Sequence, residues 1–358
     1  MKLTRWWFNV RVLIVKTSSL GDVIHTLPAV TDAAHAHPGM DIDWVVEEAL
    51  AEIPTWHPAV GRVIPVAMRR WRGMLRQGLK NGEIRAFLRD LRAKRYDKII
   101  DAQGLLKSAL ITRLARGVRY GLDRDSAREA LASYAYQHRY LIAKKQHAIE
   151  RLRQLFAQAL DYSLPRTAPD YGIQTPDLLD EHANYGYVVF LHGTTWATKL
   201  WPEDHWMALA QLVNAAGLAV YLPWGTAQEL GRAQRIAAVA SDATVLPRQT
   251  LHQVASILAG AKGLVGVDTG LAHLGAALAV PAVTIYGATS PGLTGTVGKH
   301  QQHAVAKFTC SPCGSRTCTF PGNVAVTPAC YQSLSPQHVW SLLQQTWVDA
   351  TESVLKVR

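Results

Sequence analysis

A carboxylate follows the first apolar run of the chain, at the point where a helix is expected to begin. Residues 12–25 read Val-Leu-Ile-Val-Lys-Thr-Ser-Ser-Leu-Gly-Asp-Val-Ile-His, which predicts a buried strand, a small polar loop and a helix that starts near Asp22. Asp22 could accept a proton from a substrate hydroxyl, as a general base does. The alternative is that Asp22 only caps the helix, a role worth about 1 kcal/mol, and spacing alone favours the cap. The run lacks the glycines of a dinucleotide fingerprint and the Gly-Lys-Ser/Thr of a P-loop, so we expect no nucleotide here.

A lysine lies just before a helix in the second half of the chain. Phe190-Leu191-His192-Gly193-Thr194-Thr195 is followed by Lys199-Leu200-Trp201-Pro202, so a strand opens into a Gly/Thr loop ahead of a helix start. Backbone N–H groups and one ammonium can hold a diphosphate. A solvated loop lysine is an equally good interpretation of the same residues.

A third motif places an acid at the end of an apolar strand. Residues 263–274 read Gly-Leu-Val-Gly-Val-Asp-Thr-Gly-Leu-Ala-His-Leu. Asp268 or Thr269 can cap the following helix, whose first N–H groups, at Thr269, Gly270 and Leu271, could bind a phosphate. Asp-Thr-Gly also occurs in aspartic proteases, but those need an all-β fold that this sequence does not suggest.

A fourth motif follows another predicted strand. In Leu222-Pro223-Trp224-Gly225-Thr226-Ala227-Gln228-Glu229, Trp224 could flank a nucleotide base and Glu229 could accept ribose hydroxyls. A turn followed by a helix-start carboxylate explains these residues equally well.

Basic residues are concentrated in the first half of the chain. Lys and Arg number 38 against 27 Asp and Glu, a formal net charge of +11. Residues 1–180 hold 28 basic and 19 acidic residues, and residues 69–98 alone hold 11 and 3. The densest run, Arg69-Arg70-Trp71-Arg72, continues through Arg76, Lys80 and Arg85. A solvated helix face or a nucleic-acid surface would fit, but three Arg around one Trp favour local capture of an anion.

Four cysteines lie close together late in the chain, as Cys310-x2-Cys313-x4-Cys318-x11-Cys330. This spacing permits a tetrahedral zinc site, although it is less regular than a paired Cys-x2-Cys ribbon. Reduced thiols are the other interpretation for a protein of the cytoplasm. We therefore give a structural metal the smaller weight and expect no catalytic one.

The elements that must position these motifs alternate along the chain. A length of 358 residues points to two domains, and 48% hydrophobic with 18% charged residues excludes disordered and coiled-coil classes. Strands are predicted at 11–16, 42–46, 63–66, 98–101, 118–121, 187–192, 219–223, 244–246, 263–267 and 282–286. Helices are predicted at 202–216, 227–240, 251–259 and 336–349. Each half therefore reads as a doubly wound α/β domain with ligands at the carboxyl ends of its strands, and the Pro-rich segment 161–185 as their junction.

No apolar run is long enough for a membrane span, and residues 1–9 make a poor signal peptide, so we expect the chain in the cytoplasm. Taken together, the motifs resemble the lipopolysaccharide heptosyltransferases of glycosyltransferase family 9, most closely the type I members. The likeness covers about residues 10–300. It rests on residues 12–30, Asp43-Trp44-Val45-Val46-Glu47-Glu48, Arg69-Arg70-Trp71-Arg72, Asp101-Ala102-Gln103-Gly104-Leu105, Lys199 with Trp201-Pro202, Leu222-Pro223-Trp224-Gly225, and Val267-Asp268-Thr269-Gly270-Leu271-Ala272-His273-Leu274.

This resemblance implies a GT-B fold, two Rossmann-like domains facing across a cleft. Residues 1–170 would bind the acceptor, residues 171–335 would bind ADP-heptose, and a helix in 336–358 would pack back on the first domain. The implied reaction is metal-independent, inverting transfer of L-glycero-D-manno-heptose from ADP-L-glycero-β-D-manno-heptose to the Kdo region of Kdo2-lipid A. No cofactor is implied. The partners would be these two substrates and the cytoplasmic face of the inner membrane, with no nucleic acid, and the protein would be a monomer.

The resemblance also assigns site residues. Asp22 would be the base and Lys199 would counter the charge on the leaving diphosphate. The donor would contact Thr194, Thr195, Lys199, Trp224, Glu229, Asp268, Thr269, Gly270, Leu271 and His273. The acceptor would contact Ser18, Ser19, Gly21, Arg69, Arg70, Arg72, Gln103 and Lys107.

Two segments depart from the type I pattern. Residues 1–9 precede the usual start, and Trp6, Trp7 and Phe8 could touch a membrane interface or reflect an upstream start codon. The tail 308–333 is more similar to that of type II members. The alternatives are therefore a type II or other core heptosyltransferase, a UDP-sugar epimerase of GT-B fold, and a non-enzymatic polyanion binder.

Overall fold

Two compact α/β units make up the chain in a computed structural model. The structure describes residues 10–73, 81–174, 186–322 and 324–355, with side chains described as far as residue 349. The first unit comprises residues 1–174 and the second residues 175–358. The predicted junction, residues 161–185, contains this boundary. Trp6, Trp7, Phe8, Arg76 and Lys80 lie outside the described residues.

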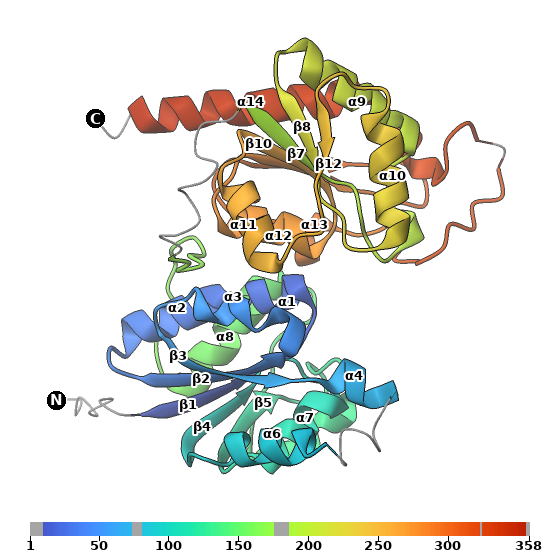
Figure 1. Cartoon of the computed structure of the whole chain (residues 1–358). Helices are drawn as coiled ribbons and strands as arrows, with labels where there is room; N and C mark the ends of the chain where they lie inside the picture. The colour runs from blue at the N-terminus through green and yellow to red at the C-terminus, as the bar shows by residue number, and fades with distance from the viewer. Residues whose placement is uncertain (1–9, 74–80, 175–185, 323, 356–358) are drawn as a thin grey trace. The chain divides into compact units, whose positions relative to one another are not determined.

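Each unit is built on a six-stranded parallel sheet (Figure 1). The strands of the first are β1 Arg11–Val15, β2 Asp41–Glu47, β3 Val60–Val66, β4 Tyr96–Asp101, β5 Gly117–Leu122 and β6 His138–Tyr140. Those of the second are β7 Tyr187–Leu191, β8 Ala219–Leu222, β9 Ala243–Val245, β10 Gly263–Val267, β11 Ala282–Tyr286 and β12 Gln301–Val305.

The strand orders are β3-β2-β1-β4-β5-β6 and β12-β11-β10-β7-β8-β9. In both sheets the first strand in chain order lies in the middle. From it the chain first adds strands out to one edge of the sheet, and then returns to the middle and adds strands out to the other edge. This is the doubly wound order, and it creates a crevice at the carboxyl ends of the two central strands. The central pairs are β1 with β4 and β7 with β10.

Helices cover both faces of each sheet (Figure 1). The first unit contains α1 Leu20–Ile24, α2 Leu27–Ala36, η1 Glu48–Leu50, α3 Glu52–Thr55, α4 Met68–Gly73, α6 Glu83–Leu91, α7 Leu106–Leu114, η2 Ala130–Ala135 and α8 Ala148–Leu160. The second contains η4 Ala197–Lys199, α9 Glu203–Ala215, α10 Ala227–Ala237, α11 Leu251–Ala259, α12 Gly270–Ala277, α13 Pro291–Thr294, η5 Ala329–Ser333 and α14 Pro336–Leu355.

Every predicted strand and helix is present, within a few residues of its predicted bounds. Two strands at sheet edges, β6 and β12, were not predicted. Both are polar and partly exposed, so they show neither a continuous apolar run nor a clear alternation.

Helix α14 packs into the core of the second unit. Its side chains Val339 and Leu343 are fully buried there with Trp201 and Trp206, and the Trp347 indole donates to the Lys262 carbonyl at 2.8 Å. Its apolar stripe covers the face of the sheet next to α9, where those two tryptophans lie. Packing of this helix on the first domain as well stays a prediction.

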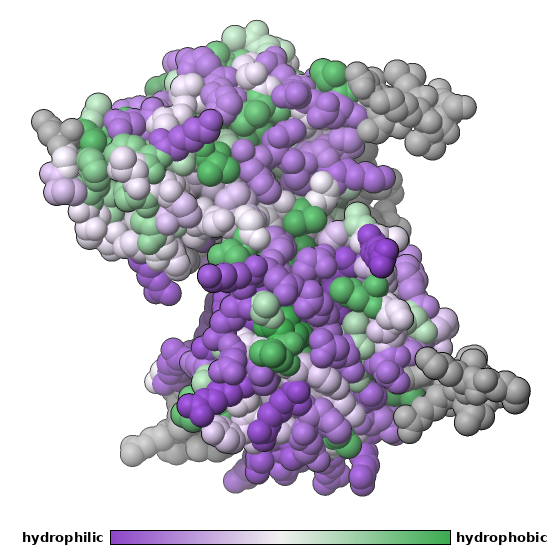
Figure 2. Space-filling model, turned by 180° about the vertical axis from the view of Figure 1, so that it is seen from behind, coloured by the Kyte–Doolittle hydropathy of each residue, from purple (hydrophilic) through white to green (hydrophobic). Residues whose placement is uncertain are grey.

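The described helices include none that is both long and apolar enough to cross a membrane. Seen from behind, both units present mainly hydrophilic residues with smaller hydrophobic groups interspersed (Figure 2).

Candidate functional site

Polar loops follow the central strands of each sheet, and they contain many of the predicted site residues. In the first unit, Lys16 to Asp22 follow β1 and Gln103 follows β4. In the second, Thr194 to Lys199 follow β7 and Asp268 follows β10. Because these are the paired central strands, the loops meet at the crevice where doubly wound sheets bind ligands.

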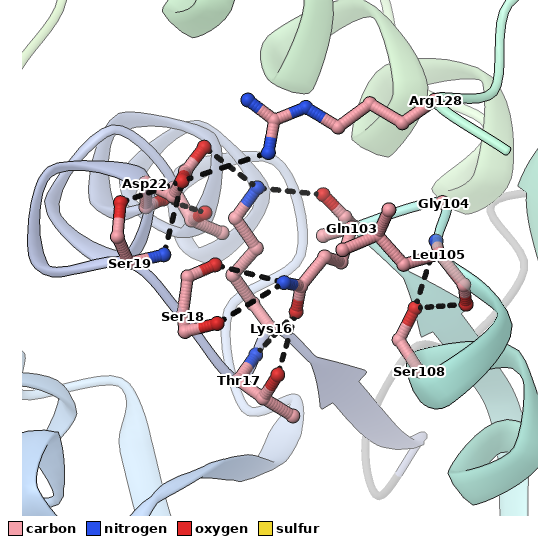
Figure 3. Close-up of polar contacts among 12 residues, drawn as sticks. Lys16, Thr17, Ser18, Ser19, Asp22, Gln103, Gly104, Leu105, Ser108 and Arg128 are labelled. Atoms are coloured by element: carbon pink, nitrogen blue, oxygen red, sulfur yellow. Dashed lines mark hydrogen bonds and ion pairs between the residues drawn. The ribbon is translucent and has the colours of Figure 1, made fainter. Parts of the chain in front are cut away.

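Asp22 lies in the first turn of α1 and its carboxylate is held by that turn (Figure 3). Its Oδ2 accepts hydrogen bonds from the Ser19 amide at 3.0 Å and the Ser19 hydroxyl at 2.8 Å. Ser19, not Asp22, is therefore the N-cap residue of α1, and Asp22 bonds back to it from the third position of the helix. These bonds fix the orientation of the carboxylate, and the Asp22 side chain remains 21% exposed.

Two cations lie beside Asp22 (Figure 3). The Lys16 ammonium is 3.6 Å from Asp22 Oδ1, and the Arg128 guanidinium is 3.9 Å from Oδ2. Burial alone would raise the pKa of Asp22, but the Lys16 and Arg128 charges and the Ser19 hydrogen bonds hold that pKa well below its ordinary value. Burial lowers the pKa of Lys16, and the Asp22 charge opposes that effect. The carboxylate is consequently ionised at neutral pH.

The Gln103 side chain fixes the loop that leads into α1 (Figure 3). Its carbonyl accepts from the Thr17 amide and the Thr17 hydroxyl, both at 2.8 Å, and its amide nitrogen donates to the Ser18 carbonyl at 2.9 Å. Gln103 is buried. All the contacts described for its side-chain amide are with the predicted acceptor loop. Gln103 therefore fixes the geometry of that loop.

Behind Gln103, a buried carboxylate shapes the turn after β4. Asp101 accepts hydrogen bonds from the Gln103 and Gly104 amides at 2.9 and 3.0 Å and from the Tyr136 hydroxyl at 2.7 Å. Burial raises the pKa of Asp101. Gly104 has a φ of 67°, a left-handed conformation that a side chain would strain.

Lys107 and the basic helix α4 bring further positive charge to this loop. The Lys107 ammonium donates to the Ser18 hydroxyl at 2.9 Å. Burial lowers the pKa of Lys107, and the Arg69 and Arg72 charges lower it further, so these cations act on one region. Such a group of cations, next to an ionised carboxylate, suits a substrate that carries both a hydroxyl and negative charge.

Arg70 differs from its neighbours. Its guanidinium forms ion pairs with Glu48 at 3.0 Å and Glu83 at 2.6 Å, and the Trp71 indole donates to Glu83 at 3.0 Å. Arg70 and Trp71 therefore hold α4 in place. The structure thus shows Arg70 bound to carboxylates of its own unit. Ser19 and the buried Gly21, which were also predicted to contact the acceptor, belong to the turn that holds Asp22.

In the second unit, Lys199 and Asp268 form a close ion pair. Lys199 Nζ is 2.7 Å from Asp268 Oδ2, which also accepts from the Thr289 hydroxyl at 2.6 Å. His273 Nε2 is 3.8 Å from Asp268 Oδ1. Burial would raise the pKa of Asp268, but His273 and Lys199 hold it well below its ordinary value. The Lys199 ammonium also lies 4.7 Å above the Trp196 ring, with Arg316 at 5.2 Å from the same ring.

Helix α12 starts directly after Asp268. Thr269 is its N-cap residue, and the Thr269 side chain forms no capping hydrogen bond. Gly270 and Leu271 lie in the first turn, where backbone amides have no partner within the helix. Thr194 donates to the Asp268 carbonyl at 3.3 Å, while Thr195 is exposed. The loops after β7 and β10 therefore meet beside a helix N-terminus with an ammonium next to it, as an anion site requires.

Glu229 caps α10 and faces the same loops. Its Oε2 accepts from the Gly225 and Thr226 amides at 2.8 and 3.0 Å. Its Oε1 packs against Gly193, where a Cβ atom would force the Glu229 side chain to move. Trp224 donates through its indole to the Leu246 carbonyl at 2.7 Å, which fixes the orientation of the ring.

Lys16, Arg128, Thr289 and Arg316 are site residues that the sequence motifs did not identify. Lys16 lies inside the motif of residues 12–25, and the change from apolar strand residues to a lysine could have marked it as a site residue. Arg128 and Thr289 reach their carboxylates from distant parts of the chain, and no local pattern marks them.

A structural metal at the four cysteines stays a prediction. Within the described ranges, no group of three or more His, Cys, Asp or Glu side chains is placed to hold a metal ion. All four cysteines are free; Cys310 and Cys313 are exposed, whereas Cys330 is buried in the core beside Tyr331. Burial raises the pKa of Cys330 to about 11, and the charges of Cys310, Cys313 and Cys318 act in the same direction.

Comparison with known proteins gives consistent matches. The family model "Glycosyltransferase family 9 (heptosyltransferase)" matches residues 84–323. Lipopolysaccharide heptosyltransferase 1 of Pseudomonas aeruginosa is 54% identical over 345 residues, which cover 94% of this chain and 97% of that protein. Escherichia coli heptosyltransferase WaaC with ADP has a TM-score of 0.84 at 48% identity, over 94% of this chain and all of that one. The same enzyme with ADP-2-deoxy-2-fluoro heptose has a TM-score of 0.80 at 47% identity, over 94% and 99% of the two chains. The predicted fold class is confirmed.

Proposed function

The chain belongs to glycosyltransferase family 9, the heptosyltransferases, and from this premise we propose that it moves L-glycero-D-manno-heptose from ADP-heptose to the Kdo region of Kdo2-lipid A. The reaction inverts the anomeric carbon and takes place at the cytoplasmic face of the inner membrane without a metal. The observation that carries the proposal is the ionised Asp22 carboxylate between Lys16 and Arg128, at the carboxyl end of β1.

Asp22 is the proposed general base. The acceptor hydroxyl attacks the anomeric carbon, its proton passes to Asp22, and the bond from that carbon to the diphosphate oxygen breaks with the electron pair leaving on ADP. A carboxylate of low pKa is a weak base in the free enzyme. An anionic acceptor would compete for Arg128 and Lys16, and its own charge would raise the pKa of Asp22 as it binds.

The cations around Ser18 are the proposed acceptor site. Lys107 contacts the Ser18 hydroxyl, and Arg69 and Arg72 act on Lys107 electrostatically. Kdo carboxylates and lipid A phosphates are anions that guanidinium groups bind well. Gln103 positions the loop from behind. The contacts of Arg70 favour a structural role for it over direct acceptor binding.

The Lys199 and Asp268 pair is the proposed diphosphate site. An ammonium has three N–H donors, and the bond to Asp268 leaves two for the phosphates as negative charge develops on the leaving group. The amides of Gly270 and Leu271 and the positive end of α12 add to this stabilisation. Thr194, Thr195, Thr269 and His273 would complete the donor contacts, with Glu229 at the ribose and Trp224 at the base.

One assay tests the proposal and its alternatives. The purified chain is incubated with ADP-heptose and Kdo2-lipid A in EDTA, and the product is weighed by mass spectrometry. Addition of one heptose supports the proposal. Transfer only to the monoheptosylated acceptor would instead identify a type II enzyme, and conversion of a UDP-sugar without acceptor an epimerase. Binding to any polyanion without transfer to either acceptor would overturn the enzymatic proposal.

A further inference from the structure

Four large hydrophobic side chains are exposed together on α7 and η2. Leu106, Leu110, Leu131 and Tyr134 are 50%, 57%, 64% and 59% exposed, and we call them the α7–η2 patch. They are four of the eleven exposed large hydrophobic residues in the described part of the chain. Single exposed apolar side chains are ordinary on soluble proteins, but a contiguous group marks an interaction surface.

The patch is not a by-product of core packing. Helix α7 and η2 bury a seam of their own between them, formed by Ala109, Ala132, Ala135 and Tyr136. Leu106 and Leu110 are four residues apart on the outer face of α7, and Leu131 and Tyr134 are three apart in a 3-10 turn. Both pairs therefore point outward beside a seam that is already closed by other side chains.

The surroundings of the patch are basic. Residues 105–145 contain nine Lys and Arg and three Asp and Glu. Arg113 continues the exposed face of α7, and the Arg139 guanidinium lies 5.7 Å from the Tyr134 ring. Two of the three acids are engaged locally, because Glu129 accepts from the Leu106 amide at 2.5 Å and Asp123 from the Ser126 amide at 2.8 Å. Asp125 is exposed.

The patch also adjoins the Asp22 site. Leu106 follows Gln103 by three residues, and Leu131 follows Arg128 by three, the residue whose guanidinium lies 3.9 Å from Asp22. The Glu129 amide donates to the Gly104 carbonyl at 3.0 Å and ties η2 to the loop that carries Gln103. A surface bound to the patch would therefore lie next to the proposed base.

We propose that the α7–η2 patch docks the protein on an anionic lipid bilayer, with its leucines and Tyr134 entering the interface and the surrounding arginines at the headgroups. Apolar side chains inside a basic rim match the layered chemistry of such a membrane, in which acyl chains lie beneath anionic headgroups. The inference rests on the proposed function in one respect: a lipid-linked acceptor would be presented to Asp22 at this surface.

The first test measures binding to vesicles that contain no acceptor. The full chain is sedimented with vesicles of phosphatidylcholine alone or with 30% phosphatidylglycerol. We expect strong binding only to the anionic vesicles, and on the order of tenfold weaker binding for L110S/L131S. The matched control is V239S/V348S, which removes two exposed apolar residues of the second unit. Equal sedimentation of L110S/L131S and the wild type would overturn the proposal.

Two further measurements separate the remaining possibilities. Transfer to a water-soluble, deacylated acceptor should be the same for L110S/L131S and the wild type, while transfer to vesicle-bound acceptor falls. If the wild type transfers no heptose to the soluble acceptor, the proposed function is wrong. The vesicle-binding result then still tests membrane docking by itself. Analytical ultracentrifugation showing a wild-type dimer that L110S/L131S abolishes would assign the patch to a second copy of the chain and overturn membrane docking.

Discussion

The Lys16 ammonium lies 3.6 Å from the Asp22 carboxylate and donates to the Ala102 carbonyl at 3.0 Å. One cation thus connects the end of β1 to the start of α1 and to the residue after β4. Lys16 is almost fully buried, so its charge acts on Asp22 with little screening by solvent. Three elements of the fold consequently control the protonation of a single carboxylate.

Replacing Asp22 by Asn should remove turnover and spare donor binding. We expect kcat to fall by roughly 10²–10⁴-fold, the usual contribution of a general base. ADP affinity, measured by calorimetry, should stay unchanged, because the donor site is assigned to the second unit. The control S19A loses a hydrogen bond to Asp22 but keeps the base, and should retain most activity. A D22N variant with near-normal kcat would exclude the base role.

Arg128 should set the acid limb of the pH profile. The pKa of Asp22 is held low by Lys16 and Arg128, so the carboxylate keeps its charge to low pH and activity is lost only as pH falls through that pKa. R128A removes one cation, raises the pKa of Asp22 and should shift the acid limb of kcat/KM to higher pH. The neighbouring exposed R124A is the control. An acid limb at the same pH in R128A and the wild type would contradict this electrostatic coupling.

Lys199 should affect both turnover and donor affinity. K199M removes the ammonium 2.7 Å from Asp268 and leaves that buried carboxylate without its closest cation. We expect kcat to fall by about 10²–10³-fold, as when one donor to a developing anion is removed. Binding of ADP should weaken as well. K262M, which removes a lysine that lies over Trp347, serves as control, and equal effects of the two variants would argue against the role of Lys199.

The sequence predicted the parts of this site that depend on local patterns. Asp22, Lys199 and Asp268 each follow an apolar strand. A strand and the charged residue that follows it can be recognised together within about ten residues of sequence. Arg128 lies 106 positions from Asp22, so only the folded sheet brings them together. The ion pairs of Arg70 could not be predicted for a related reason: its partners Glu48 and Glu83 are distant in sequence, and a basic run does not reveal which of its members is already paired.

A buried ion pair should dominate the packing of α8 on α2. Arg153 and Asp32 form a 2.7 Å contact with side chains only 3% and 8% exposed. R153M leaves the Asp32 charge buried and unpaired, so we expect a loss of about 3–5 kcal/mol in the free energy of unfolding. R89A breaks the exposed pair with Asp90 and should cost less than about 1 kcal/mol. Urea denaturation measures both, and similar losses would refute the assignment.

His57 should make the first unit sensitive to acid. Its Nδ1 accepts from the Ala59 amide at 3.2 Å, so Nε2 carries the proton and donates to the Thr31 hydroxyl at 2.9 Å. Burial lowers the pKa of His57 to about 4, whereas the unfolded value is about 6.5. The contribution of neutral His57 to the free energy of unfolding is therefore complete above pH 6.5 and decreases as pH falls toward 4.

The loss from this one residue approaches an amount on the order of 3 kcal/mol. Urea denaturation at pH 7.5 and pH 4.5 should show a smaller difference for H57Q than for the wild type. A difference of the same size in both proteins would rule out His57 as the source.

The bonds between Thr17 and Gln103 join positions 86 residues apart. Closing a chain segment of that length is slow and costs conformational entropy that no neighbouring turn can recover. We therefore expect the loop before Asp22 to obtain its final shape only after β4 has docked on β1. A kinetic intermediate with native helices but an unpaired β1 would contain every catalytic residue of the first unit and no working acceptor site. Recovery of acceptor binding should accordingly lag behind recovery of helical signal when the protein refolds.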